Sequence, residues 1–480
     1  MDEDNFQAAT EAFLSWLEEI GVRINPKMVV KDLRSKGLGR GVVAAASFEE
    51  DEIIFSIPRN LVLNMNTIFA SDNANSGREA LASMPPWLAL TAALLSEAQQ
   101  PNSKWAPYLA VLPKNLDSLV FWSDTELAQL QASTVVGKIG RAGAEEMFSK
   151  YLVPLGLGEY NSDMYHRVAS IIMAYAFDIP EESTSKQDTG VAEGEADDLV
   201  SDDGEDEKTI LSMIPLADLL NADADRNNAR LCCDNEDLEM RTIKPISEGQ
   251  EILNDYGQLP RSDLLRRYGY VTEDYSSYDV AEISTSLVTS VLGAERLSLP
   301  NGSHLDPLSH GDLEKRINLA DREGVLDETY DLVHSGQDGP AVSDELIALM
   351  YLLLLDEDNL EAIITAKTSL PSRSKIATEL VGQVLAVLIQ RREHEYATTM
   401  EEDEKLMLAG NLPKRTEMAI QVRRGEKKVL RGAVNEAFSF SGANKRMRIG
   451  QESPRNDSKG ANGRKQTDDT CHPTKKRRFN

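Results

Sequence analysis

The sequence predicts an α+β fold with two β-rich segments, a long helical insertion between them and an all-α C-terminal domain. Residues 31–58 and 213–270 contain short apolar runs bounded by glycine, proline and charged residues, a pattern typical of turn-rich β structure. Residues 78–176 and the chain beyond about residue 297 instead show apolar residues at helical spacing. No internal repeat of fixed period is found, which argues against a solenoid or a propeller.

The first domain is predicted to span residues 23–275, after an N-terminal helix within residues 1–22. We expect this helix because large apolar side chains recur at helical spacing over residues 13–20. Two strands are predicted at about 42–46 and 53–58, where apolar runs lie on either side of a charged turn.

Helices are predicted for the insertion, at about residues 60–165, and for the C-terminal domain, at residues 276–440. Within the C-terminal domain, Val384 and Leu388 belong to one apolar helical face that begins near residue 376. The longest apolar run of the chain has ten residues, about half the length that a membrane helix needs. We therefore expect no contact with a membrane.

The charge is unevenly distributed along the chain, whose formal net charge is −28. Residues 181–208 contain twelve acidic and two basic side chains and no apolar period, so we expect a disordered acidic loop. Residues 441–480 contain eleven Lys/Arg and four Asp/Glu, so we expect a disordered basic tail. Its clusters at 445–448 and 475–478 are typical of signals for a nuclear import receptor, although an ordinary solvated tail would have the same composition. We expect a nuclear protein that can shuttle to the cytoplasm.

The composition limits the classes of function that need consideration. The chain outside the acidic loop and the basic tail also has an excess of acidic residues, and we call this part the acidic body. It repels phosphate, so direct binding of nucleic acid is not expected. Three cysteines are too few for a disulfide framework or a four-cysteine zinc site, and the six histidines are scattered, so we expect no metal. The first residues lack the basic and apolar regions of a secretory signal. We expect a soluble, intracellular monomer.

A glycine-rich turn at residues 37–41 is the first candidate functional segment. Its glycines allow positive φ angles and a close approach of the backbone to a ligand, although a plain structural turn has the same composition. The turn is not a dinucleotide-binding fingerprint, because no helix pattern follows it. It is not a phosphate-binding loop either, because no Gly-Lys-Ser/Thr closes it.

Two later segments combine polar or aromatic residues with apolar runs and turns. Asp218 and Asn221 lie near the end of the apolar run 213–222, where they must find partners or would simply cap a helix end. Two Tyr-Gly pairs, which begin at Tyr256 and Tyr268, could likewise be aromatic core residues beside tight turns.

In this order, the three segments resemble a SET-domain methyltransferase, and the resemblance covers roughly residues 23–275. The helical insertion would then interrupt the SET fold. The C-terminal domain is similar to that of the Rubisco large-subunit methyltransferase type, and within this type the chain most resembles the fungal ribosomal lysine N-methyltransferases and their animal relatives. The segments that carry this second resemblance are residues 165–177, 412–420 and 424–428.

The resemblance implies transfer of a methyl group from S-adenosyl-L-methionine to a protein lysine. By position, Tyr256 matches the active-site tyrosine of the family, while Trp122 and Asp218 match positions that approach the substrate. The residues that would line the cofactor are Lys36, Gly37, Leu38, Gly39, Tyr175, Asn221, Ala222 and Tyr268.

The chemistry of lysine methylation explains why tyrosines suit such a site. Displacement at a sulfonium methyl requires amine, methyl carbon and sulfur to lie nearly in line, so positioning contributes much of the catalysis. Only the neutral amine attacks, and an aromatic channel beside a positive sulfonium lowers the lysine pKa from about 10.4. A tyrosine hydroxyl can orient the amine without adding a competing charge.

Ala222 departs from the Asn-His pair of many SET enzymes. In the family this pair holds the adenine largely through backbone groups, which alanine retains, so we expect an active enzyme. No Cys-rich segment follows the SET region, which argues against the branch that closes its site with zinc.

The leading hypothesis is a protein-lysine N-methyltransferase that acts on a basic substrate, a large-subunit ribosomal protein. An acidic body would attract such a substrate. One alternative is a SET enzyme that methylates another protein, on lysine or on histidine. The other is a non-catalytic SET-derived binding module, which predicts no binding of S-adenosylmethionine.

Overall fold

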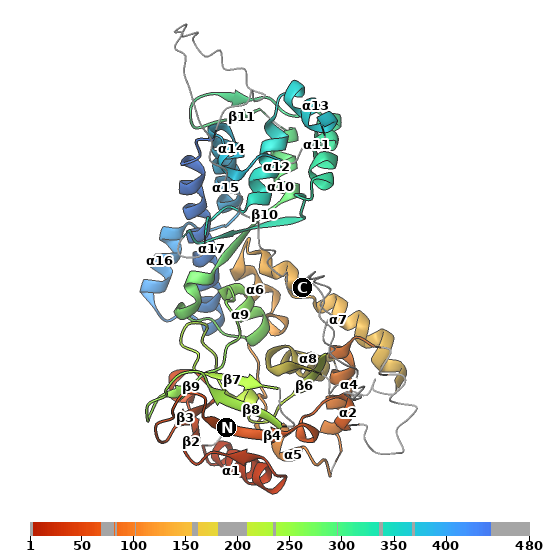
Figure 1. The fold of residues 1–480 in the computed structure, drawn as a ribbon, viewed down its shortest axis with the longest axis vertical. Coiled ribbons are helices and arrows are strands. Elements are labelled where there is room, and N and C mark those ends of the chain that lie inside the picture. The colour runs from red at the N-terminus through yellow and green to blue at the C-terminus, as the bar shows by residue number, and fades with distance from the viewer. Residues whose placement is uncertain are drawn as a thin grey trace, which may run out of the picture.

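The computed structural model (Figure 1) describes most of the chain up to residue 442. The described residues are 3–68, 81, 84–100, 102–155, 162–180, 209–233, 237–294, 296–335, 339–366 and 370–442. The predicted acidic loop at 181–208 lies outside them, and so does the predicted basic tail from residue 443 onward.

Sixteen helices are found in the described ranges, with short 3₁₀ turns between some of them. They are α1 (Glu3–Glu19), α2 (Met65–Ile68), α4 (Pro86–Ala98), α5 (Ala106–Val111), α6 (Asp124–Leu127), α7 (Arg141–Met147), α8 (Ser162–Tyr175), α9 (Arg261–Tyr268), α10 (Thr285–Ala294), α11 (His310–Arg322), α12 (Asp344–Leu354), α13 (Glu357–Ala366), α14 (Arg373–Ile376), α15 (Glu379–His394), α16 (Met400–Ala409) and α17 (Lys414–Phe438). The strands are β1 (Arg23–Ile24), β2 (Met28–Asp32), β3 (Arg40–Ala44), β4 (Ile53–Pro58), β5 (Ala176–Pro180), β6 (Thr209–Met213), β7 (Ala229–Cys232), β8 (Asp237–Thr242), β9 (Glu251–Ile252), β10 (Val280–Ser284), β11 (Leu297–Ser298), β12 (His304–Leu305) and β13 (Thr329–Val333).

Strands from both sides of the helical insertion pair with one another to build the first domain. One sheet has the order β1-β4-β8-β7 and another has the order β2-β3-β9, with antiparallel pairing throughout. The predicted strands near 42–46 and 53–58 are confirmed as β3 and β4. Ile54, Phe55 and Ile57 of β4 have no exposed surface, so both faces of this strand are buried. This burial explains why its sequence is a continuous apolar run rather than an alternating one.

The predicted N-terminal helix is confirmed as α1, which covers the sheets at the lower end of the molecule in Figure 1. Phe13 and Leu17, four residues apart, are fully buried on the face that it turns inward. The Phe13 ring stacks on Tyr108 of α5 with 6.0 Å between the ring centroids. The insertion thus packs against the N-terminal helix as well as against the sheets.

Residues 261–268 form the helix α9, although the segment 213–270 was predicted to be β structure as a whole. The helix starts directly after Pro260 and ends at Gly269, which stops it by adopting the left-handed conformation with a φ of 75°. The apolar pair Leu264 and Leu265 supplies its buried face. A helix of eight residues shows too little periodicity to stand out beside the neighbouring β pattern.

The C-terminal domain is mainly helical, as predicted, but it also contains two antiparallel strand pairs, β10–β13 and β11–β12. The expectation of an all-α domain is corrected on this point. In β13, Tyr330 and Leu332 are buried between exposed neighbours, which is the period of a half-buried strand. The signal is only five residues long, and its partner β10 lies far away in the sequence, so the pairing was missed.

The predicted apolar face that includes Val384 and Leu388 is confirmed in α15, where both residues are fully buried. The face does not belong to one continuous helix, because α14 ends at Ile376 and α15 begins at Glu379. Thr378 caps α15, since its side chain accepts a hydrogen bond from the backbone N–H of Val381 at 3.3 Å.

The long helix α17 joins the two domains, because it runs from the C-terminal domain to α9 and the turn that follows α6 (Figure 1). Met418, Ala419 and Val422 of α17 form a buried apolar cluster with Leu265 of α9 and with Trp122. We call the region around this helix the domain junction.

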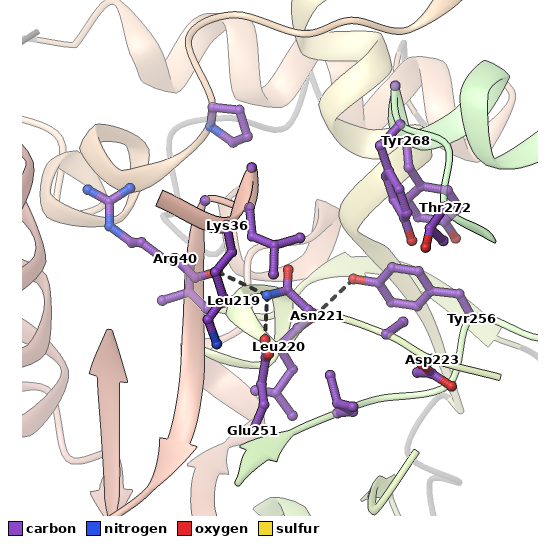
Figure 2. Close-up of a pocket in the computed structure, with 18 of the residues that line it drawn as sticks. Lys36, Arg40, Leu219, Leu220, Asn221, Asp223, Glu251, Tyr256, Tyr268 and Thr272 are labelled. Atoms are coloured by element: carbon purple, nitrogen blue, oxygen red, sulfur yellow. Dashed lines mark hydrogen bonds between the residues drawn. The ribbon is translucent and has the colours of Figure 1, made fainter. Parts of the chain in front are cut away.

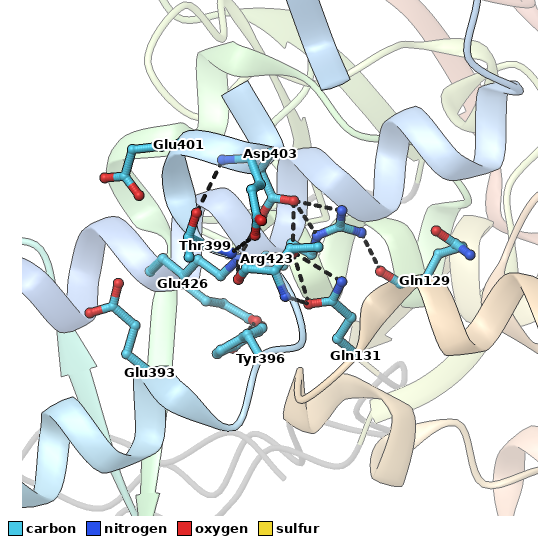
Figure 3. A network of polar contacts seen from close by, with 12 residues as sticks. Gln129, Gln131, Glu393, Tyr396, Thr399, Glu401, Asp403, Arg423 and Glu426 are labelled. Atoms are coloured by element: carbon cyan, nitrogen blue, oxygen red, sulfur yellow. Dashed lines mark hydrogen bonds and ion pairs between the residues drawn. The ribbon is translucent and has the colours of Figure 1, made fainter. Parts of the chain in front are cut away.

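A buried polar network completes the domain junction (Figure 3). Asp403 of α16 accepts hydrogen bonds from Arg423 at 2.6 and 2.9 Å and from Lys427 at 2.7 Å. Arg423 also donates to the carbonyl of Gln129, which belongs to the insertion of the first domain. All three charged side chains are almost completely buried. The network therefore fixes α17 against both domains.

Candidate functional site

A cavity of about 1280 Å³ is lined by the turn before β3 and by the segments around Asp218 and Tyr256 (Figure 2). The first turns of α17 line it as well. Every predicted cofactor residue lines it, as do Asp218 and Tyr256. The structure thus brings together residues from four separate parts of the sequence. Such a cavity with convergent polar groups is the expected place for a ligand.

The glycine-rich turn presents bare backbone to the cavity. Lys36, Gly37, Leu38 and Gly39 line it, and Gly37 has a φ of 78°, which favours glycine. A Cβ added at Gly37 or at Gly39 would meet no protein atom within 4 Å. No neighbouring protein atom therefore occupies the space that a side chain at Gly37 or Gly39 would fill. A ligand that approaches this backbone closely would need that space to be free.

The N-terminal helix braces this turn from the outside. The guanidinium groups of Arg34 and Arg40 lie 3.9 and 3.8 Å from the centroid of the Phe6 ring of α1. Arg40 also donates to the hydroxyl of Thr10 at 2.9 Å and to the carbonyl of Val111 at 3.0 Å. Sequence reasoning missed these positioning contacts, because nothing local in the chain relates α1 to residues 34–40.

Asn221 and Ala222 lie on the second wall of the cavity, in a short parallel bridge with Asn254. Asn254 donates its N–H to Asn221 at 2.8 Å, and Asp223 donates its N–H to Asn254 at 3.1 Å. This pairing does not use the N–H and C=O of Ala222. The side chain of Asn221 points to Glu251 and donates to its carboxylate at 2.7 Å (Figure 2).

Two tyrosines form the aromatic wall of the cavity. The rings of Tyr256 and Tyr268 are stacked, with 4.6 Å between their centroids and 6° between their planes (Figure 2). The Tyr256 hydroxyl donates to the carbonyl of Leu220 at 3.1 Å. Burial raises the pKa of the Tyr256 phenol well above its usual value, so the group stays neutral. Because its proton points to Leu220, the phenol oxygen can accept a hydrogen bond from another group.

Asp218 is a buried carboxylic acid on the same cavity. It accepts a hydrogen bond of 2.5 Å from the Tyr108 hydroxyl, and its Oδ1 atom has no partner. Burial raises the pKa of Asp218 to about 7, while the bond from Tyr108 acts in the opposite direction. Burial likewise raises the pKa of Tyr175, a third residue of this wall, to about 12. Tyr108 was not predicted, since it comes from the insertion and carries no motif of its own.

Trp122 lies apart from the cavity. Its side chain is 1 % exposed and packs in the apolar cluster of the domain junction, where its indole N–H donates to the carbonyl of Asp117 at 2.8 Å. It does not line the cavity, while its neighbour Asp117 does. A contact of Trp122 with substrate stays a prediction.

Within the described residues, no group of three or more His, Cys, Asp or Glu side chains is arranged to hold a metal ion. The same part of the chain contains no helix that is long and apolar enough to cross a membrane.

Comparison with known proteins identifies the class that this fold and cavity define. Residues 39–257 match the SET domain, and residues 310–430 match the Rubisco LSMT substrate-binding domain. Both matches lie inside the two domains predicted from the sequence. The chain belongs to the SET-domain protein-lysine methyltransferases of the Rubisco LSMT type, as predicted, and the cofactor of this class is S-adenosylmethionine.

Among individual relatives, the chain is 32% identical over 370 residues to ribosomal lysine N-methyltransferase 4 of Saccharomyces cerevisiae, covering 73% of this chain and 72% of the relative. It is 27% identical over 461 residues to the N-lysine methyltransferase SETD6 of Rattus norvegicus, covering 88% and 89% of the two chains. A crystal structure of LSMT bound to lysine and AdoHcy matches 90% of this chain and 91% of its own, with a TM-score of 0.64 at 19% identity.

Proposed function

We propose that this protein transfers a methyl group from S-adenosylmethionine to a lysine of a large-subunit ribosomal protein, with Tyr256 at the reacting centre. The observation that carries the proposal is that one cavity contains the glycine turn, the Asn221–Ala222 bridge, the stacked tyrosines and the start of α17. Cofactor and substrate elements therefore meet in one place.

The residues present fit the cofactor. Lys36, Gly37, Leu38 and Gly39 offer backbone to the cavity without Cβ atoms in the way at the two glycines. Ala222 retains an N–H and a C=O that the bridge to Asn254 does not use. A histidine side chain is not needed for such backbone contacts, which supports an active enzyme. When bound, S-adenosylmethionine supplies an electrophilic methyl group.

Tyr256 acts by orienting the substrate amine. Its proton is donated to the Leu220 carbonyl, so its oxygen accepts an N–H of the lysine and turns the lone pair of the amine away from the ring. The raised pKa keeps the phenol neutral and prevents it from stabilising the ammonium form as a charged group would. The stacked ring of Tyr268 restricts the position of Tyr256, and such positioning is a large part of this catalysis.

Asp218 provides a second contact for the substrate. Its Oδ1 atom is buried and lacks a partner, so a hydrogen bond with the amine of a lysine in the cavity would satisfy it. The first turns of α17 supply Lys414, Glu417 and Gln421 to the same cavity, where they would contact residues beside the lysine. This placement agrees with the match of α17 to a substrate-binding domain.

Two observations support a ribosomal protein as substrate. The yeast relative at 32% identity is named for ribosomal lysine methylation. The acidic excess of this chain, 79 Asp and Glu against 51 Lys and Arg, would attract basic proteins, and ribosomal proteins are of that kind.

The test is to incubate the full chain with radiolabelled S-adenosylmethionine and purified large ribosomal subunits, with Tyr256→Phe as a matched control. We expect one labelled protein with the wild type and little label with the control. Mass spectrometry of the labelled peptide should find methyl-lysine. Label on histidine, or only on non-ribosomal proteins of an extract, would favour the alternative SET enzymes. Failure to bind S-adenosylmethionine in calorimetry would favour the second alternative, a non-catalytic SET-derived binding module.

We also propose that the protein is a nuclear monomer that an import receptor recognises through its basic tail. The support is the charge pattern of residues 441–480, above all the cluster at 475–478. Deletion of 441–480 should move a fluorescent fusion to the cytoplasm and leave turnover in vitro nearly unchanged. Loss of turnover would instead indicate that the tail contacts substrate. Light scattering after size exclusion should give a mass near 53.1 kDa, and twice that mass would contradict a monomer.

A further inference from the structure

The helix α9 carries Tyr268, its last residue, to the aromatic wall of the cavity. The stacking of Tyr268 on Tyr256 has nearly parallel planes, 6° apart, so a shift or tilt of α9 would disturb it. The position of this short helix is therefore a condition for the geometry of the site.

The C-terminal end of α9 is held by close backbone contact. A Cβ added at Gly269 would lie 2.7 Å from the backbone nitrogen of Ser118 and 2.8 Å from the backbone carbon of Asp117. These atoms belong to the insertion and cannot yield as a flexible side chain would. This contact fixes only one end of the helix.

The N-terminal end of α9 is held by a buried ion pair. Arg261, 2 % exposed, donates from its guanidinium to Asp279, 3 % exposed, at 2.5, 2.9 and 3.1 Å. Its backbone N–H donates to the same carboxylate at 3.1 Å. With so many bonds to one partner, the Asp279 carboxylate has little freedom to move.

The helix α17 rests directly on this ion pair at Gly425. A Cβ added there would overlap the Asp279 carboxylate, 2.5 Å from its Cγ, and would lie 2.6 Å from a guanidinium nitrogen of Arg261. Glycine in a helix interior is unfavourable, so a specific reason is expected for it. Here the reason is that only a residue without a side chain allows α17 to approach the start of α9.

We propose that Gly425, Arg261 and Asp279 are positioning residues of the methyl-transfer site, which seat α17 on α9 and thereby hold Tyr268 against Tyr256. The substrate-binding domain is then needed to complete the cofactor wall of the SET domain as well as to bind substrate. This role rests on the proposed function, because it takes Tyr268 as part of the cofactor site.

The test measures the Kd of S-adenosylmethionine by calorimetry on the full chain, where the stoichiometry reports the folded fraction separately. Gly425→Ala should raise the Kd about tenfold, because a misplaced wall loses contacts that depend on geometry. Gly432→Ala on the same helix is the matched control, since a Cβ there meets only the Ser335 hydroxyl oxygen at 4.0 Å. This control should change the Kd less than twofold.

A double-mutant cycle with Tyr268→Ala distinguishes positioning from general destabilisation. If Gly425 acts through Tyr268, adding Gly425→Ala to Tyr268→Ala should change the Kd less than twofold. The proposal would be overturned if the two substitutions raised the Kd independently, so that their fold-changes multiplied in the double variant. It would also be overturned if Gly425→Ala lowered only the Tm and left the Kd unchanged.

If the Gly425→Ala variant does not fold, Arg261→Lys can test the positioning role instead. This substitution retains the positive charge but loses the forked contact with Asp279. It should raise the Kd in the wild-type background and not in the Tyr268→Ala background, and equal effects in both would overturn the proposal. A wild-type chain that does not bind S-adenosylmethionine would instead refute the proposed function, and the positioning role with it.

Discussion

Two buried carboxylic acids, one on the cavity and one in the domain junction, have similar pKa values and different surroundings. Burial raises the pKa of Asp218 to about 7, and burial also raises the pKa of Glu426 to about 7. Both oxygens of Glu426 are hydrogen-bonded, one to the Ser133 hydroxyl and the other to the Tyr396 hydroxyl, each at 2.6 Å. Asp218 accepts one from Tyr108, and its Oδ1 atom is left without a partner.

The comparison shows that a perturbed pKa does not by itself identify a functional acid. Both groups are shifted by loss of solvent, which occurs in structural networks and in active sites alike. The unsatisfied oxygen and the cavity beside it are what separate Asp218 from Glu426. A ligand can bond to the free oxygen of Asp218, whereas each oxygen of Glu426 already has a protein partner.

The largest effect is expected when the junction network loses its central anion. Asp403→Ala would leave Arg423 and Lys427 buried without their shared partner, which should cost about 3–5 kcal/mol of stability. The matched control is Glu404→Ala, an exposed neighbour on α16, which should cost less than about 0.5 kcal/mol. Urea unfolding of the two variants checks this, and equal losses would show that the network contributes little.

The next largest effect comes from replacing a tyrosine by phenylalanine in the cavity and in the domain junction, which should affect mainly activity in the first region and stability in the second. Tyr256→Phe should lower kcat by about 100-fold, because the hydroxyl that orients the amine is lost. It should cost about 1 kcal/mol of stability, because the Leu220 carbonyl loses its donor. Tyr396→Phe removes a donor from Glu426 and should cost about 1–3 kcal/mol of stability while kcat stays within twofold. Steady-state kinetics and thermal unfolding of both variants check the pair. If Tyr396→Phe also lowered kcat strongly, the two regions would not be separable.

The predicted and the missed residues of the site differ in how local their signals are. The glycine turn at 37–41 and Tyr256 were predicted because each lies in a short motif. Tyr108 was missed because its partner Asp218 is 110 residues away and only the folded insertion brings them together.

In the fold, too, only elements with a local sequence signal were predicted. The strands β3 and β4 were predicted from their apolar runs, whereas the helix α9 and the pair β10–β13 were not. Gly425 is a plain helical glycine in the sequence, and only the position of Asp279 gives it a role. Contacts between distant segments leave no period or spacing in the chain, so patterns of residues cannot reveal them.

The pH dependence of stability should also distinguish the two acids. In the unfolded chain Asp218 ionises near its usual pKa of 3.8 and Glu426 near 4.5, but in the folded chain both stay protonated up to about pH 7. The folded state therefore binds more protons, so stability falls as the pH rises from about 5 to 7, by about 1.4 kcal/mol per pH unit for each group.

Asp218→Asn and Glu426→Gln should each remove part of this slope, which urea unfolding at pH 5, 6 and 7 would measure. Saturating S-adenosylmethionine, a cation, should reduce the Asp218 contribution by favouring its ionised form and leave that of Glu426 unchanged. If S-adenosylmethionine changed the pH dependence of stability equally in both variants, Asp218 and Glu426 would not differ in their access to the ligand, and the distinction between them would be wrong.

The smallest effect concerns Trp122, which the family resemblance assigns to substrate and the structure places in the domain junction. Trp122→Phe removes the hydrogen bond to the Asp117 carbonyl, whereas Trp105→Phe removes an equally buried indole whose N–H has no partner. The first variant should therefore be less stable than the second by about 1 kcal/mol. Because Trp122 does not line the cavity, the KM for the protein substrate should change less than twofold. A clear rise in that KM with kcat unchanged would instead support the substrate contact, and would mean that the junction opens toward the cavity when substrate binds.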